Sequence, residues 1–92
     1  MGPEMISSDQ CLTCLVALTG SDEERPLSLA SGYLDAFVPL VAADRAKGAR
    51  LLIELKGRFT RRMEPSPLRT DLLELLEARI VRLSDPLDEL GP

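Results

Sequence analysis

The sequence predicts an all-α fold, a small bundle of about four helices plus a short C-terminal helical turn, which dimerisation could complete. Ninety-two residues can bury only one core. Hydrophobic residues make up 45% of the chain but aromatics only 3%, so the core must be aliphatic and leucine-rich, which favours helices. Leucines also repeat with the helical period over 66–83. We expect one helical domain at 7–92, after a disordered or vector-derived N-terminus at 1–6.

The first expected helix begins at Ser7 and ends near Thr19. The segment Ser-Ser-Asp-Gln at 7–10 matches a capping box, in which the Ser7 side chain accepts from the amide of Gln10 and the Gln10 side chain reaches back to Ser7. Gly20 is suited to the left-handed conformation that often ends a helix. A polar, charged loop then leads to the second helix.

The second expected helix begins at Ser28, where apolar residues again follow the helical period. Pro39 lies inside this pattern and has no amide proton for the helical hydrogen bond. We therefore expect a kink or a break near Val38. The helix should end between Ala43 and Gly48, where glycine follows a lysine.

The third stretch, 49–63, fits two templates. Leu51 and Ile53 begin an alternation that one face of a strand would show, whereas a helix places Leu52 and Phe59 on one apolar line with basic residues opposite. The helical template accounts for more residues. We therefore predict a helix here, although a strand remains the alternative.

The fourth helix carries the strongest signal in the chain. Ser66 is a suitable cap and Pro67 suits the first helical position, and the apolar pattern continues to Leu83. Its apolar arc is too wide for one partner helix, so the helix should contact at least two neighbours. Asp85 and Pro86 can start the final helical turn.

The apolar surface of this last helix exceeds what we expect one small domain to bury. The excess predicts a non-enzymatic protein–protein interaction module, such as a regulatory subunit, adaptor, chaperone or inhibitor, that forms a homodimer or binds another protein through this helix. The expected interface residues are Leu72, Leu73, Leu76, Arg79, Ile80, Leu83, Leu87 and Leu90.

Arg79 falls inside or beside the apolar arc. The favoured interpretation is that its methylene groups cover the core while its guanidinium stays in water. In the alternative, the guanidinium is buried against a carboxylate. That carboxylate would come from Asp35, Asp44, Glu54 or a second chain.

A basic stripe runs over 45–62 and holds seven of the eleven basic residues, interrupted only by Glu54. Such a stripe can contact phosphates, so a nucleic-acid-associated helical protein is an alternative function. No aromatic residue is interleaved for base stacking, since Phe59 belongs to the apolar side. A solvated face, or one that contacts an acidic partner, is therefore favoured. The candidate residues are Lys47, Arg50, Arg58, Arg61 and Arg62.

Cys11 and Cys14 have the spacing of a redox pair or of half a zinc site. The chain has no histidine and no third cysteine, so a four-thiolate site would need two chains. We favour the interpretation that Cys11 and Cys14 are small core residues, and we expect no cofactor.

The absence of histidine and of a glycine-rich phosphate loop argues against catalysis. The apolar run 11–18 is too short to span a membrane, and acidic residues precede it where a secretory signal is basic. We therefore expect a cytoplasmic protein without a membrane partner.

Overall fold

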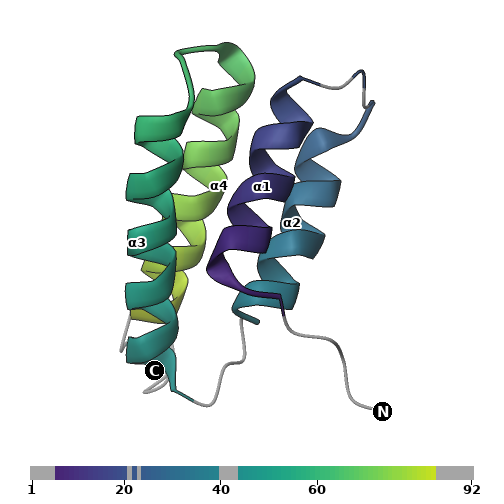
Figure 1. Cartoon of the computed structure of the whole chain (residues 1–92). Coiled ribbons are helices and arrows are strands. Elements are labelled where there is room, and N and C mark those ends of the chain that lie inside the picture. The colour runs from purple at the N-terminus through teal and green to yellow at the C-terminus, as the bar shows by residue number, and fades with distance from the viewer. Residues whose placement is uncertain (1–5, 21, 23, 40–43, 85–92) are drawn as a thin grey trace, which may run out of the picture.

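The computed structural model describes residues 6–20, 22, 24–39 and 44–84. Within these ranges the chain is helical and has no strand, which confirms the all-α prediction and the helical template for the third stretch (Figure 1). The helices are α1 (Ser8–Thr19), α2 (Pro26–Phe37), α3 (Arg45–Arg62) and α4 (Pro67–Ser84).

The helices form two antiparallel hairpins, α1–α2 and α3–α4, which pack side by side (Figure 1). Across the hairpins α1 contacts α3, and α2 contacts α4. The Thr19 hydroxyl at the end of α1 lies 3.7 Å from the sulfur of Met63 at the end of α3, so these two helices run parallel. In this arrangement the first turn of α1 contacts Arg58, in the C-terminal half of α3, which matters for the site below.

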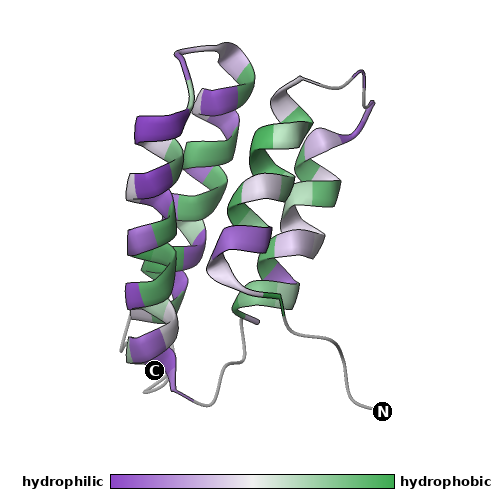
Figure 2. Cartoon of the chain, in the orientation of Figure 1, coloured by the Kyte–Doolittle hydropathy of each residue, from purple (hydrophilic) through white to green (hydrophobic). Residues whose placement is uncertain are grey.

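The core lies between the hairpins, and apolar residues line the inner faces of the helices while polar residues face outward (Figure 2). Burying one leucine side chain stabilises the fold by roughly 1.5–3 kcal/mol, so these residues dominate its stability. The largest side chains that are almost completely inaccessible are Cys11, Leu15, Leu34, Leu52, Leu55, Phe59, Leu72 and Leu76.

Two helix starts follow the sequence closely. The Gln10 amide donates to Ser7 Oγ over 3.2 Å, and the Ser7 amide donates to Gln10 Oε1 over 2.9 Å, which confirms the capping box. At α4, the Arg69 amide donates to Ser66 Oγ over 3.0 Å, and Pro67 opens the helix. Both caps satisfy amides that lack a partner within the helix.

The boundary between α2 and α3 differs from the expectation. The predicted break occurs, because α2 ends at Phe37 with Val38 as its C-cap. The predicted helix end at 43–48 is wrong, since α3 begins there. The carboxylate of Asp44 accepts from the Lys47 amide over 3.0 Å and so caps α3. Asp44 suits the start of a helix and Gly48 suits the end of one, so the local sequence fits both, and the side-chain cap shows that a helix starts here.

Smaller corrections concern the ends of α1 and α2 and the N-terminus. Gly20 has φ −106°, outside the left-handed region, so its backbone does not require glycine. Helix α2 starts at Pro26 rather than Ser28, because proline suits the first turn. Ile6 was expected in the N-terminal tail, but its amide donates to the carbonyl of Ala36 over 3.1 Å. The expected final turn after Ser84 lies outside the described residues.

Candidate interaction surfaces

The apolar residues of α4 that were expected at an interface lie inside the single chain. Leu72, Leu76, Ile80 and Leu83 are between 0% and 8% exposed, because α2 and α3 both pack on this helix. Leu73 is half-buried against the same core. The wide apolar arc of α4 is therefore covered by the chain itself. Leu87 and Leu90 lie outside the described residues.

Arg79 is buried, which corrects the expectation that its guanidinium stays in water. The guanidinium donates to the carboxylate of Asp35 and to both the hydroxyl and the carbonyl of Ser31. Of the carboxylates considered, Asp35 is thus the one that pairs with it. These bonds join α4 to α2, and Arg79 is a contact within the chain.

The basic residues of α3 divide into those that bond to the rest of the chain and those that face solvent. Arg45 donates to the carbonyls at the end of α4, and Lys56 pairs with Glu77 over 2.7 Å. Arg58 pairs with Asp9 of α1. Four others are exposed, and the described part of the chain offers them no ion pair. These four are Lys47, Arg50, Arg61 and Arg62.

Three of the five predicted basic residues line a shallow, solvent-open cleft of about 250 Å³ between α1 and α3. Arg58, Arg61 and Arg62 line it, together with Leu12 of α1. Arg61 and Arg62 belong to the last turn of α3, where cations are favoured by the helix dipole. We call these four residues the arginine cleft. Lys47 and Arg50 lie nearer the start of α3, on its exposed side.

Arg58 is fixed by two contacts with the first turn of α1. Its Nη1 donates to Ser8 Oγ over 2.9 Å, and its Nη2 donates to Asp9 Oδ1 over 2.5 Å. No local pattern predicts the pairing of Arg58 with Asp9, because the two residues are 49 positions apart. Leu12 was likewise not anticipated at the site. Both follow from the parallel packing of α1 on α3.

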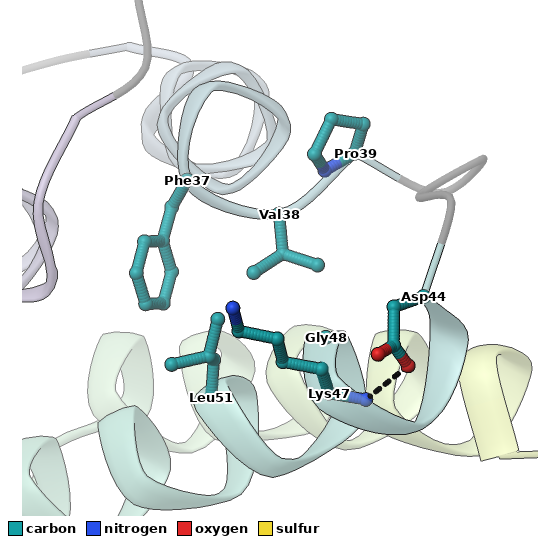
Figure 3. Close-up of a pocket in the computed structure, with 7 residues that line it drawn as sticks. All are labelled: Phe37, Val38, Pro39, Asp44, Lys47, Gly48 and Leu51. Carbon is teal, nitrogen blue, oxygen red and sulfur yellow. Dashed lines mark hydrogen bonds between the residues drawn. The ribbon is translucent and has the colours of Figure 1, made fainter.

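A second, more apolar cleft of about 230 Å³ lies between the end of α2 and the start of α3. Phe37 and Val38 point toward α3, Leu51 points back toward them, and the side chain of Lys47 lies across the gap (Figure 3). Pro39 and Asp44 also line this cleft. We assign it no function.

The two cysteines are free thiols in different environments. Cys11 is fully buried, and its pKa is raised to about 12, chiefly by burial and further by Cys14. A protonated, inaccessible thiol is a poor nucleophile. Cys14 is half-buried at the edge of a shallow pocket. Over the described residues no three cysteine or carboxylate side chains gather as metal ligands would.

Comparisons with protein-family models, with curated proteins and with solved structures found no match to this chain. The residues themselves must therefore support any functional conclusion. Among the helices that the structure describes, none has both the length and the apolar character that crossing a membrane requires.

Proposed function

We propose that this protein is a non-enzymatic interaction module that binds an acidic segment of a partner protein through the basic face of α3. We define this face by Lys47, Arg50, Arg58, Arg61 and Arg62. The observation that supports the proposal is the gathering of three arginines around one cleft, two of them exposed and without an ion pair among the described residues. An adaptor or regulatory subunit would use such a surface.

The chemistry of arginine favours carboxylates as ligands. A guanidinium offers several donors in a planar fork that matches a carboxylate, and adjacent guanidinium groups can each take one. A single exposed ion pair contributes little, about 0.2–1 kcal/mol. Useful affinity needs several ion pairs on one rigid helix face, and α3 supplies the basic side chains for them.

The proposal moves the expected binding surface from α4 to α3. The homodimer expected from the sequence rested on leucines of α4 that one chain already buries. The large apolar side chains that stay exposed are spread over three helices instead of one continuous arc. They are Leu27, Leu29, Ile53 and Val81.

A protein partner is favoured over a nucleic acid. Phe59 on α3 is completely buried and Phe37 nearly so, so neither offers a ring on which a base could stack. The net charge of −4 also opposes a long polyanion that extends beyond the basic face. A short acidic segment would contact only the basic face and would not extend over the acidic remainder of the surface.

The two free thiols fit the reducing cytoplasm, where we place the protein.

The test is binding of a short fluorescein-labelled peptide of glutamate and leucine at low ionic strength, followed by fluorescence anisotropy. Arg61→Gln with Arg62→Gln should weaken binding by roughly two- to thirtyfold, since the loss of two exposed ion pairs removes about 0.4–2 kcal/mol. The control is Arg25→Gln with Arg82→Gln, which changes the net charge equally away from the basic face. An equal loss of peptide affinity in the two double variants would contradict the proposal. Tighter binding of the wild-type protein to a short DNA duplex than to the peptide would also contradict it.

A further inference from the structure

We infer that Asp9 competes with the acidic partner for Arg58. The Asp9 carboxylate pairs with Arg58 until a carboxylate of the partner replaces it. The inference rests on the proposed function, because it concerns the same cleft. Its basis is that the Asp9 carboxylate already makes with Arg58 the contact that a partner's carboxylate would make.

The exposure of the two side chains supports an exchange. The Arg58 side chain is 37% exposed and lines the cleft together with Leu12, whereas the Asp9 side chain is 81% exposed at the start of α1. The arginine is thus held at the cleft while its carboxylate partner is open to solvent. A pair this exposed contributes little to folding, so it can be replaced without loss of the fold.

The neighbours of Arg58 show where the partner would begin. Arg61 and Arg62 line the same cleft and carry no internal carboxylate among the described residues. A partner segment can engage these two first and then compete with Asp9 for Arg58. Ser8 continues to hold the other nitrogen of Arg58, over 2.9 Å, so the guanidinium stays at the cleft during the exchange.

Removing the Asp9 charge should therefore strengthen binding, which a purely structural ion pair would not do. With the same glutamate–leucine peptide, Asp9→Asn should bind about two- to fivefold more tightly than wild type. The matched control is Glu74→Gln, an exposed residue of α4 that changes the net charge equally. If both variants shift the affinity by the same factor, the competition does not exist.

A double-mutant cycle makes the test independent of helix α1 stability. In a background of Arg58→Gln, Asp9→Asn should give no more improvement than Glu74→Gln, because the contested position is gone. Circular dichroism verifies that each variant is folded. An Asp9→Asn gain that persists in this background would overturn the inference.

The outcomes separate this inference from the proposed function. If neither the wild type nor Asp9→Asn binds the peptide, both proposals fail. If wild-type binding is weakened by the Arg61 and Arg62 changes but Asp9→Asn behaves like Glu74→Gln, the proposed function stands and the competition fails. If Asp9→Asn favours a DNA duplex over the peptide, the partner class is wrong.

Discussion

Arg79 shows how one polar residue can fix the packing of two helices. Its guanidinium is buried between α2 and α4 and has partners on Asp35 and Ser31. The Arg79 end of this ion pair is buried, while the Asp35 side chain is 57% exposed. Such a pair does not always stabilise a fold, but a buried charge left without its partner is costly. We expect Arg79 to set the register of α4 against α2 more than it adds net stability.

The two partners of this pair should respond unequally to substitution. Asp35→Ala leaves the Arg79 charge buried with only Ser31, and should lower the free energy of unfolding by about 1–3 kcal/mol. Arg79→Met, which removes the charge and fills similar space, should cost less. Urea denaturation of both variants measures this. A larger loss for Arg79→Met would mean that the pair itself supplies net stability.

The residue scale is also where sequence reasoning reached least far. The pattern placed Arg79 beside the apolar arc but could not choose among three carboxylates. It treated Arg58 as one member of a stripe, because a bond to Asp9 across 49 positions has no local signal. Cys11 was correctly favoured as a core residue, since its spacing to Leu15 and Leu18 follows the helical period.

At the scale of elements, local signals predicted most of the fold. The capping box before α1, the break before Pro39 and the start of α4 after Ser66 were all confirmed, because each depends on neighbouring residues. The start of α3 was missed. Asp44 was assigned to the end of the preceding helix, although it caps the next one.

The Asp44 cap yields a prediction for α3. Asp44→Ala removes the acceptor for the Lys47 amide and should destabilise the protein by about 1 kcal/mol, whereas Asp44→Asn keeps an acceptor and should cost less. Thermal denaturation followed by circular dichroism compares the variants. Equal stability of Asp44→Ala and wild type would show that this cap does not hold the start of α3.

For the whole molecule, periodicity identified the apolar face of α4 but not what covers it. A wide apolar arc can face helices of the same chain or of a second copy, and the apolar periodicity in the sequence is the same in both cases. In the structure, α2 and α3 of the same chain pack against the apolar face of α4. The basic face of α3 was predicted from the same kind of pattern, and its cleft with α1 required the parallel arrangement of the hairpins.

The solution mass tests this single-chain core. Light scattering after size exclusion should give about 10.1 kDa at all concentrations, since one chain buries the leucines of α4. Ile80→Glu should then lower the free energy of unfolding independently of protein concentration, because it places a charge in the core. A dimer that Ile80→Glu separates into folded monomers would contradict this packing.

The measurement that tests the central claim most directly is a titration of the ¹⁵N-labelled protein with the glutamate–leucine peptide, followed by amide chemical shifts. The account predicts that the largest changes occur around Leu12, Arg58, Arg61 and Arg62, and that added salt reverses them. If the spectrum stays unchanged at low salt, or if the changes gather on α4 instead, the basic face of α3 is not the binding surface.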